Sequence, residues 1–412
     1  MGRIDTVVIG GGQAGLAMSR CLSDRGVDHV VFERRRIAER WRSERWESLR
    51  LLTPNWQSRL PGFRYDGDDP DGFMTMPEVV AYLERYSRTL TVPVQTDTTV
   101  TAVRPRESGF TVETTRGQWA ARSVVIATGY CDRPFVPDQA HDLDADIVQV
   151  TPTSYRNAAQ LPEGRVLVVG ASASGIQLAD QIHRSGRAVT LAVGRHTRLP
   201  RRYRGKDIMW WLDAMGVFDE TTDDVYDVDI SRRQPSMQLV GRPDHSSLDL
   251  PILQADGVRL TGKLTQIDRH QVSFADDLVA HTAAADARLA RLLGRVDDFI
   301  QITGTPAGPA EPFEPFIWPN PAPESLDLRA EQIRTVLWAT GFRRAYPWLH
   351  VPVIGRDGEI RHERGVTAAG GLYVLGMHFQ RRRKSGFIDG VGSDAAELAD
   401  HIAARGRREA VA

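Results

Sequence analysis

One strand–glycine turn–helix pattern occurs twice in this chain of 412 residues, and the two copies are 160 residues apart. Val7-Val8-Ile9-Gly10 corresponds to Leu167-Val168-Val169-Gly170, and Gly15 corresponds to Gly175. In each copy a helix comes after the turn and a second apolar strand comes after the helix. Continuous apolar strands are typical of a parallel sheet that is covered on both faces. The repeat therefore predicts an α/β chain with two βαβ units, each with a right-handed crossover.

The first turn, Gly10-Gly11-Gly12-Gln13-Ala14-Gly15, is a complete G-x-G-x-x-G motif. In this motif the first glycine makes the bend, the second admits a pyrophosphate and the third lets the helix pack on the strand. The helix N-terminus offers free N–H groups to the phosphates. Glu33 stands at the end of the returning strand, where an acid binds a ribose hydroxyl. A ligand-free glycine turn is the alternative. The candidate cofactor contacts are Gly10, Gly12, Gln13, Ala14, Gly15 and Glu33.

The second turn, Gly170-Ala171-Ser172-Ala173-Ser174-Gly175, differs from the first in its middle residue and in the residues after its returning strand. The small Ser172 replaces the middle glycine, and no acid ends the returning strand. Arg195 occurs there instead, with further arginines up to Arg204. Arginine pairs with a 2′-phosphate that a carboxylate would repel, so the pattern favours NADPH over NADH. A solvated basic loop is the alternative. The candidate contacts are Gly170, Ser172, Ala173, Ser174, Gly175, Arg195 and Arg202.

Two apolar strands, Val124–Ile126 and Val336–Trp338, both end in Ala-Thr-Gly. Small residues at a strand end allow close approach to a bound cofactor. The candidate contacts here are Thr128, Gly129, Thr340 and Gly341. Two dinucleotide sites in one chain predict an electron-transfer pair, with FAD at the Glu33 site and NADPH at the Arg195 site.

Composition excludes several other classes of protein. The formal net charge of −1 disfavours a nucleic-acid binder. No apolar run approaches the roughly 18 residues of a membrane span. The two cysteines, Cys21 and Cys131, form no C-x-x-C motif, which disfavours disulfide reduction and suits a reducing cytoplasm. The eleven histidines show no metal-ligand spacing, so no metal is expected. Composition does not decide whether the chain forms a homo-oligomer, so a homo-oligomer is possible.

Together these motifs resemble the flavin-containing monooxygenase-like family of two-dinucleotide-binding FAD/NAD(P)H flavoproteins. The resemblance implies two Rossmann-like domains, with an FAD domain interrupted by an NADPH domain. The expected boundaries are 1–150 and 335–412 for the FAD domain and 151–334 for the NADPH domain. The implied enzyme is a class B monooxygenase, in which NADPH reduces FAD and O₂ forms a flavin C4a-hydroperoxide that oxygenates a small molecule.

The resemblance also implies roles for residues outside the glycine turns. Trp46, Thr53 and Asn55 would face the flavin, although ordinary packing is the alternative for each. Val100 would contact the adenine, and a closing loop before the last helix would face the flavin pyrimidine. The further cofactor candidates are Arg34, Trp41, Val100, Gln380, Gly390 and Gly392. The basic run from Arg381 to Lys384 would be either salt-bridged or anion-binding, with the first favoured.

One family signature is altered in this chain. The linking pattern F-x-G-x-x-x-H-x-x-x-W/Y is compared with the stretch from Ile147 to Arg156, and Thr151 stands where the family has histidine. Tyr155, rather than tryptophan, ends the pattern, which favours N- or S-oxygenation or hydroxylation over Baeyer–Villiger chemistry. Because the histidine is missing, an FAD/NADPH oxidase, reductase or dehydrogenase without oxygen insertion remains an alternative, as does a non-catalytic redox-sensing flavoprotein.

Three further segments have local patterns that predict structure. Alternating residues predict hairpin strands at 98–103 and 109–114, and an apolar stripe predicts an amphipathic helix at 284–300. The proline-rich stretch 305–325 is expected to be a long ordered loop that either covers the active site or connects the domains.

Overall fold

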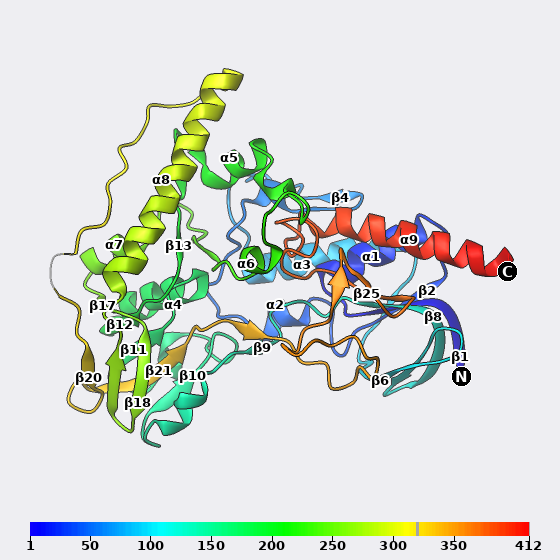
Figure 1. The fold of residues 1–412 in the computed structure, drawn as a ribbon, viewed down its shortest axis with the longest axis horizontal. Helices are drawn as coiled ribbons and strands as arrows, with labels where there is room; N and C mark the ends of the chain where they lie inside the picture. The colour runs from blue at the N-terminus through cyan, green and yellow to red at the C-terminus, as the bar shows by residue number, and fades with distance from the viewer. Residues whose placement is uncertain (319–320, 412) are drawn as a thin grey trace.

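One mixed and one parallel sheet form the centres of two α/β units in the computed structural model, which describes residues 1–318 and 321–411 (Figure 1). The first sheet has the order β23-β24-β25-β8-β1-β2-β5, and the hairpin β6–β7 extends it from β8. Its strands are β1 (Gly2–Ile9), β2 (His29–Phe32), β5 (Val94–Gln95), β6 (Val100–Pro105), β7 (Phe110–Thr114), β8 (Gly117–Ile126), β23 (His362–Glu363), β24 (Val366–Thr367) and β25 (Leu372–Val374). The predicted hairpin at 98–114 is confirmed as β6 and β7.

The second sheet has the order β10-β21-β11-β12-β17 and is parallel throughout. Its strands are β10 (Val148–Val150), β11 (Arg165–Val169), β12 (Val189–Ala192), β17 (Arg259–Thr261) and β21 (Ile333–Trp338). A three-stranded antiparallel sheet belongs to the same unit and contains β18 (Leu264–Asp268), β19 (Gln271–Phe274) and β20 (Ser325–Asp327). The shorter paired strands are β3 (Arg59–Leu60), β4 (Phe63–Arg64), β9 (Arg133–Pro134), β13 (Thr197–Arg198), β14 (Arg202–Tyr203), β15 (Lys206–Asp207), β16 (Met237–Gln238) and β22 (Phe342–Arg343).

The predicted fold class is confirmed, because the first sheet takes strands from both sides of the second unit in sequence. The expected boundaries, however, cut into the second sheet. β10 lies just before the boundary at 150/151, and β21 crosses the boundary at 334/335. By sheet membership, both strands belong to the second unit. The apolar run of β21 resembles that of β8, so sequence similarity alone does not assign it to a sheet.

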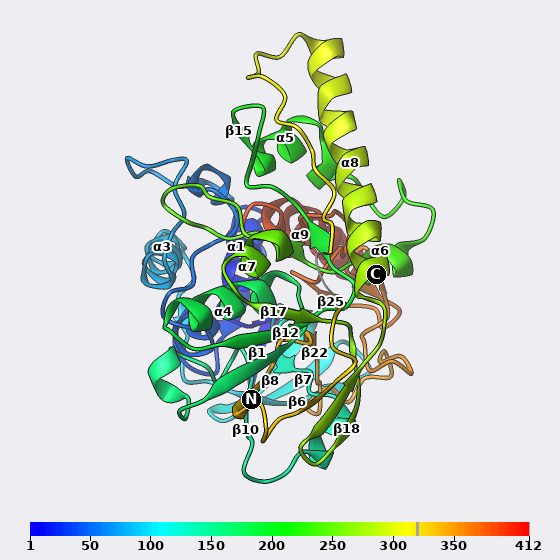
Figure 2. The ribbon, with the colours of Figure 1, turned by 90° about the vertical axis from the view of Figure 1, so that its left-hand side faces the viewer.

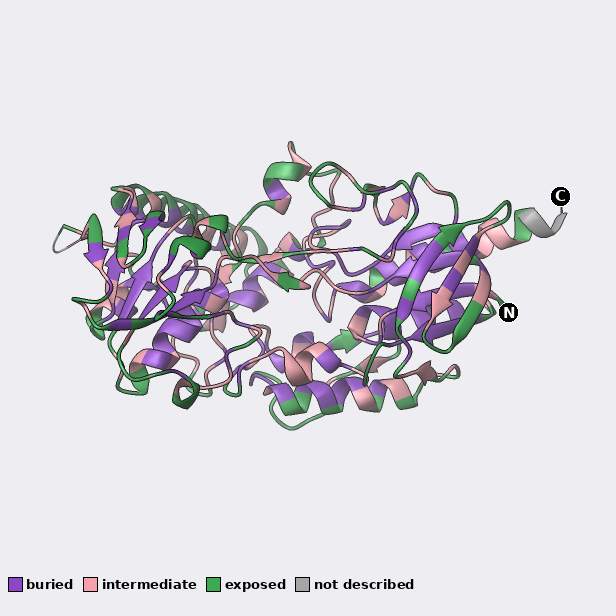
Figure 3. Ribbon diagram, turned by 90° about the horizontal axis from the view of Figure 1, so that it is seen from below, coloured by how far each residue is buried: buried purple, intermediate pink, exposed green. Residues whose placement is uncertain are grey.

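Helices cover the sheets, and the buried residues lie mainly between the layers of each unit (Figure 3). The helices are α1 (Gln13–Ser23), α2 (Glu39–Ser43), α3 (Met76–Arg88), α4 (Ala173–Arg184), α5 (Ile208–Ala214), α6 (Val228–Arg232), α7 (Leu250–Ala255), α8 (Leu278–Thr303) and α9 (Val391–Val411). Short 3₁₀ helices span η1 (Asn55–Gln57), η2 (Asp138–Asp142), η3 (Ala158–Gln160) and η4 (Val217–Asp219). Within residues 1–318 and 321–411, no helix is both long and apolar enough to cross a membrane.

Helix α8 is longer than the predicted 284–300 segment and projects from the second unit (Figures 1 and 2). Leu289, Leu293 and Val296 form its buried stripe, as the periodicity predicts. The next stretch runs back beside α8 to β20, and the backbone N–H of Phe316 donates to Asp286 of α8 over 2.7 Å. The described parts of the 305–325 loop therefore connect α8 to β20. Residues 319–320 of this loop lie outside the described residues.

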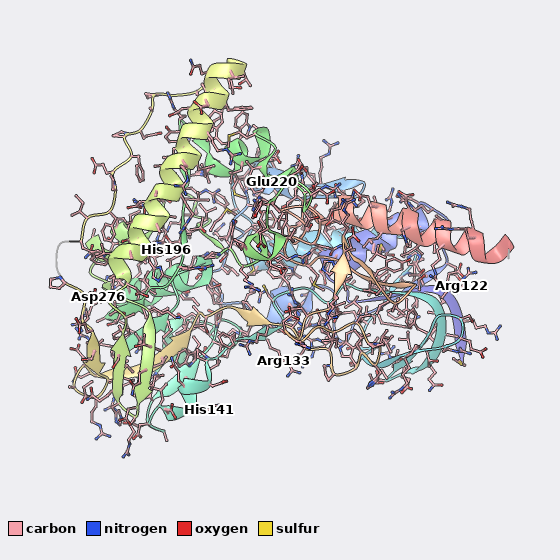
Figure 4. All side chains as sticks on the ribbon, in the orientation of Figure 1. Arg122, Arg133, His141, His196, Glu220 and Asp276 are labelled. Carbon is pink, nitrogen blue, oxygen red and sulfur yellow. The ribbon has the colours of Figure 1, made fainter. Side chains whose placement is uncertain are left out.

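Ion pairs join the two units where the closing loop meets the second unit. Arg383 pairs with Glu220, and Lys384 lies 2.9 Å from Asp219. Figure 4 labels Glu220 between the units. Arg381 and Arg382 both pair with Glu397 of α9. The basic run is therefore salt-bridged, which confirms the favoured alternative.

A buried arginine makes a second connection between the units. The Arg201 side chain is fully buried and pairs with Asp207 of its own unit. It also donates to the carbonyl of Leu52 over 2.7 Å and lies 4.8 Å from the ring centroid of Phe73. Burial lowers the pKa of Arg201 despite the neighbouring Asp207. A buried guanidinium is stable only when such partners replace its water, so these contacts hold residues 52 and 73 against the second unit.

Two histidines occupy a positively charged region at the same junction. Burial lowers the pKa of His362 to about 4, and Arg232 of α6 and Arg344 contribute in the same direction. Burial and the same two arginines also lower the pKa of His378. Both histidines are therefore neutral at pH 7 in the folded protein.

The close packing of α4 on β11 yields the first prediction. A Cβ atom added at Gly175 would lie 1.8 Å from the carbonyl oxygen of Gly170. Alanine normally stabilises a helix relative to glycine by about 0.5–1 kcal/mol. We expect Gly175→Ala instead to destabilise the protein by about 2–4 kcal/mol, measured by chemical denaturation. The matched control is Gly294→Ala in α8, where no atom lies within 4 Å of the added Cβ. Equal stabilities of the two variants would contradict the close-packing argument.

The second prediction concerns acid stability. The pKa of His362 is about 4 in the folded protein, against an ordinary value of 6.5. Below that ordinary value the unfolded chain binds a proton that the folded protein rejects, so stability falls as pH decreases from about 6.5 to 4. We expect the melting temperature of His362→Gln to fall less between pH 7.5 and pH 5 than that of the wild type. Identical pH slopes would show that His362 does not contribute.

Candidate dinucleotide sites

The first glycine turn leaves β1 at the carboxyl edge of its sheet, beside the end of β8. Gly10 has φ +117°, and a Cβ there would lie 2.5 Å from the carbonyl oxygen of Ala127. Only glycine fits at this point, and Ala127 opens the first Ala-Thr-Gly string. At Gly12, in contrast, no atom lies within 4 Å of an added Cβ. The open face at Gly12, next to the start of α1, fits the approach of a pyrophosphate.

The second turn repeats this geometry around the second sheet. Gly170 has φ +104°, and its added Cβ would lie 2.4 Å from the carbonyl oxygen of Ala339, which opens the second Ala-Thr-Gly string. Ser172 occupies the N-cap position of α4, and its side chain makes no capping hydrogen bond. The hydroxyl of Ser236 accepts a hydrogen bond from the backbone N–H of Ala173 over 3.3 Å. The two turns are thus geometric copies that differ at their middle residue.

Glu33 lies directly beside the first turn. One of its carboxylate oxygens accepts from the backbone N–H of Gly11 over 2.7 Å, and the other accepts from the N–H of Arg35 over 3.0 Å. Each oxygen keeps a further lone pair for a ribose hydroxyl. The backbone N–H of Thr98 donates to the Glu33 carbonyl over 2.9 Å, which brings the chain leading to Val100 to the same edge. These residues fit an adenosine ribose.

Other predicted contacts also surround the start of α1. The indole N–H of Trp41 donates to the side-chain oxygen of Gln13 over 3.4 Å. A Cβ at Gly376, just after β25, would lie 2.9 Å from Cβ of Ala14. The guanidinium of Arg34, another predicted cofactor contact, forms an ion pair with Glu44 over 3.1 Å.

The three flavin-face candidates lie in the segment before α3. Asn55 uses both ends of its amide within this segment: it donates to the carbonyl of Asp69 over 2.9 Å and accepts from the N–H of Met74 over 2.7 Å. These bonds give Asn55 a structural role in holding the 69–74 loop. Trp46 is buried in the core, and Thr53 is half-buried. Their contact with flavin stays a prediction.

The closing loop brings Gln380 and two glycines close to the start of α9. Gln380 is fully buried; its side-chain oxygen accepts from the N–H of Met377 over 3.3 Å. A Cβ at Gly390 would lie 1.8 Å from the carbonyl oxygen of Lys384, and one at Gly392 would lie 3.1 Å from Pro61. Tight packing therefore explains both glycines, whether or not they also contact a cofactor.

The structure separates the arginines after β12 into two groups. Arg198, Arg201 and Arg204 pair with aspartates. Arg195 and Arg202 instead donate to backbone carbonyls, those of Arg233 over 3.3 Å and of Gly205 over 2.6 Å. Among the described arginines between 195 and 204, Arg195 and Arg202 are therefore the two without an acidic partner, so their guanidinium groups can bind an anion.

Arg195 and Arg202 do not lie together. Tyr203, next to Arg202, bonds Asp297 of α8, whereas the carbonyl of His196, next to Arg195, accepts from Arg288 of α8. Nine helical residues separate these two contact points, which is about 13 Å along the helix. Sequence reasoning missed Arg288, because no local motif connects it with Arg195.

The ends of β8 and β21 carry the remaining predicted contacts. Gly129 and Gly341 have φ of +78° and +98°, and no atom lies within 4 Å of a Cβ added at either. The hydroxyl of Thr340 donates to the carbonyl of Phe135. Thr128 precedes Tyr130, whose ring lies 5.9 Å from that of His378 beyond β25. Both strand ends therefore leave open backbone at the sheet edges.

Neither cysteine is a reactive thiolate, and the two do not form a disulfide. Burial raises the pKa of Cys21 to about 11. Burial also raises the pKa of Cys131, against the opposing effect of Arg45 and Arg40. Thiol–disulfide exchange needs a thiolate, so these cysteines are unsuited to it.

One cluster of potential metal ligands occurs away from both turns. Side-chain ligand atoms of Asp144, Asp146 and His270 lie within 4.8 Å of one another. Arg269 pairs with Asp144, and Arg334 pairs with Asp146. These arginines neutralise both carboxylates, so the cluster is accounted for by ion pairing.

Comparison with known families and sequences agrees with the two-turn architecture. The model of the pyridine nucleotide-disulphide oxidoreductase family matches residues 7–214. The CzcO-like oxidoreductase of Geobacillus kaustophilus is 32% identical over 402 residues, which cover 97% of this chain and 98% of that protein. The probable indole-3-pyruvate monooxygenase YUCCA1 of Arabidopsis thaliana is 30% identical over 210 residues, which cover 48% of this chain and 49% of that protein.

Solved structures show the same fold. A flavin-containing monooxygenase from Stenotrophomonas maltophilia has a TM-score of 0.68 at 20% identity, with 98% of this chain and 99% of that chain covered. A bacillithiol disulfide reductase from Bacillus cereus has a TM-score of 0.62 at 17% identity, with the same coverage. The chain belongs to the pyridine nucleotide-disulphide oxidoreductase family and is an oxidoreductase similar over nearly its whole length to the CzcO-like protein.

Proposed function

We propose that this chain is an NADPH- and FAD-dependent monooxygenase that oxygenates a small molecule. The supporting observation is the pair of glycine turns in a chain whose two cysteines are unpaired. The first turn is open at Gly12, and the second has Ser172, without a capping hydrogen bond, at the same position. Two dinucleotide sites supply a route from NADPH to flavin. Disulfide exchange needs a pair of reactive thiols, which this chain does not have. O₂ is therefore the electron acceptor that fits the chain best.

Each cofactor is assigned to one turn by charge. Glu33 holds the ribose of FAD at the first turn, with the amides at the start of α1 on the pyrophosphate. At the second turn, Arg195 holds the 2′-phosphate of NADPH, which a carboxylate would repel. Bound FAD supplies the redox chemistry, transferring electrons from NADPH to O₂ so that one oxygen atom enters the substrate. The protein positions both cofactors and excludes water.

We infer N- or S-oxygenation or hydroxylation rather than Baeyer–Villiger chemistry, since Tyr155 ends the linking segment. Similar proteins include monooxygenases named for different substrates, such as the YUCCA1 enzyme and a steroid monooxygenase bound to NADP. The reaction is proposed to take place in the cytoplasm, with a small molecule and O₂ as its partners.

A second candidate function is an FAD/NADPH oxidase or reductase without oxygen insertion. The observation that favours it is that Thr151 stands where the linking pattern has histidine. Among the described residues, the Thr151 hydroxyl forms hydrogen bonds only within its own turn, with the hydroxyls of Thr153 and Ser154. Such an enzyme would use the same two turns and the same cofactors.

Stopped-flow spectroscopy separates these functions. We expect NADPH to bleach the bound flavin, and O₂ then to produce a transient that absorbs near ~380 nm before reoxidation. Reoxidation to hydrogen peroxide without the transient would favour the oxidase or reductase. Failure of NADPH to bleach the flavin would contradict both enzymatic functions and leave a redox-sensing role.

The 2′-phosphate assignment is tested by Arg195→Ala. Loss of a charge-assisted contact is expected to raise the KM for NADPH about tenfold or more, and to change the KM for NADH little. NADH serves as the internal control, because it has the same nicotinamide and pyrophosphate. Equal changes for both cofactors would reject the role of Arg195.

A further inference from the structure

Two arginine side chains from separate elements, Arg195 and Arg288, meet around residues 194–196, beside the backbone of Arg233. Arg195 lies after β12, Arg233 caps the end of α6, and Arg288 lies on α8. A guanidinium N–H of Arg195 donates to the carbonyl of Arg233 over 3.3 Å, and one of Arg288 donates to the carbonyl of His196 over 2.8 Å. Figure 4 labels His196 beside α8. The backbone therefore anchors both side chains, and within residues 1–318 and 321–411 their remaining N–H groups have no hydrogen-bond partner.

Arg195 and Arg288 differ from the other arginines of the region, because neither has an acidic partner in the part of the chain that the structure describes. Arg198, Arg201 and Arg204 each pair with an aspartate. Within the described residues, none of the ion pairs involves Arg195, Arg233 or Arg288. The pKa of Arg288 is lowered mainly by burial, and then by the charges of Arg291 and Arg195, with no opposing carboxylate. Like charges held together in this way are relieved by a bound anion.

The position of these two arginines identifies the anion. Both copies of the βαβ repeat place the residue after their second strand at the adenosine ribose: Glu33 comes after β2, and Val193 comes after β12. Arg195 lies two residues beyond Val193. A group bound between Arg195 and Arg288 therefore stands at the ribose edge, where NADPH differs from NADH by one phosphate.

The location of Arg288 is determined by a buried contact two residues earlier. The carboxylate of Asp286 is buried and lies 2.8 Å from the guanidinium of Arg198. Its other oxygen accepts from the backbone N–H of Phe316 over 2.7 Å. These bonds dock α8 against the second unit, so Arg288 is held beside the loop before any ligand arrives. A prepositioned charge loses less conformational entropy on binding.

We propose that Arg288 of α8 completes the 2′-phosphate site with Arg195, so that a helix outside the βαβ repeat selects NADPH over NADH. This inference rests on the proposed function, in which the second turn binds NADPH. The recognised group is the 2′-phosphomonoester of adenosine, held by guanidinium groups from two elements.

Calorimetric titration of the FAD-loaded protein with NADP⁺ and with NAD⁺ tests the proposal without turnover. The variant is Arg288→Gln, which keeps an N–H donor for the His196 carbonyl but removes the charge. We expect it to bind NADP⁺ about tenfold more weakly and NAD⁺ with unchanged affinity. Arg288→Lys, which keeps the charge without the fork, is expected to fall between wild type and Arg288→Gln.

Arg295→Ala is the matched control. Arg295 is an exposed arginine seven residues further along the same helix, and its variant is expected to bind both nucleotides like the wild type. A second titration uses 2′-AMP, 5′-AMP and inorganic phosphate as probes. Arg288→Gln is expected to weaken only 2′-AMP. Equal loss for 5′-AMP or phosphate would indicate a general anion site and overturn the proposal.

The remaining outcomes separate this inference from the proposed function. Unchanged NADP⁺ binding in Arg288→Gln, together with weakened binding in Arg195→Ala, would overturn the role of Arg288 alone. A wild-type protein that binds NAD⁺ as tightly as NADP⁺ would instead overturn the NADPH assignment at this turn. Equal weakening of both nucleotides by Arg288→Gln would show that Arg288 only supports the loop.

Discussion

The contact between a helix start and the end of its preceding strand organises both units. At Gly15 and at Gly175, an added Cβ would lie 1.8 Å from the carbonyl oxygen of Gly10 or Gly170. Only the absence of side chains lets α1 and α4 approach so closely. This approach directs each helix N-terminus over the edge of its sheet, where the dipole and free amides favour a phosphate. The neighbouring strands β8 and β21 must then end in small residues, which accounts for the two Ala-Thr-Gly strings.

The two units are joined mainly through charged and polar groups. Arg383 and Lys384 pair with Glu220 and Asp219, and Arg201 reaches the carbonyl of Leu52 from within the second unit. Such contacts depend on geometry, because a buried charge that loses its partner is strongly unfavourable. They therefore hold the closing loop and the segment around residue 52 in place relative to the second unit. The neutral His362 and His378 lie in the same positively charged junction.

Local motifs predicted a large part of this molecule. The two turns, the hairpin β6–β7 and the core stripe of α8 depend on neighbouring residues, whose spacing is visible in the chain. Other features depend on which distant segments meet. The assignment of β10 and β21 to the second sheet is one example, since an apolar strand fits either sheet. The amide of Asn55 is another: its partners in the 69–74 loop could not be identified from the flavin resemblance.

The sequence by itself determined that the chain contains two glycine turns of unequal charge, because glycine spacing and a single acid or arginine are local properties. Only the tertiary structure decided which charged groups surround each turn. Of the arginines after β12, three are neutralised by aspartates that folding brings close, and Arg195 instead meets Arg288. His196 and Arg288 are 92 residues apart in the chain. Electrostatic energy depends on the distance between charges in space, and this distance cannot be read from the number of residues between them in the sequence.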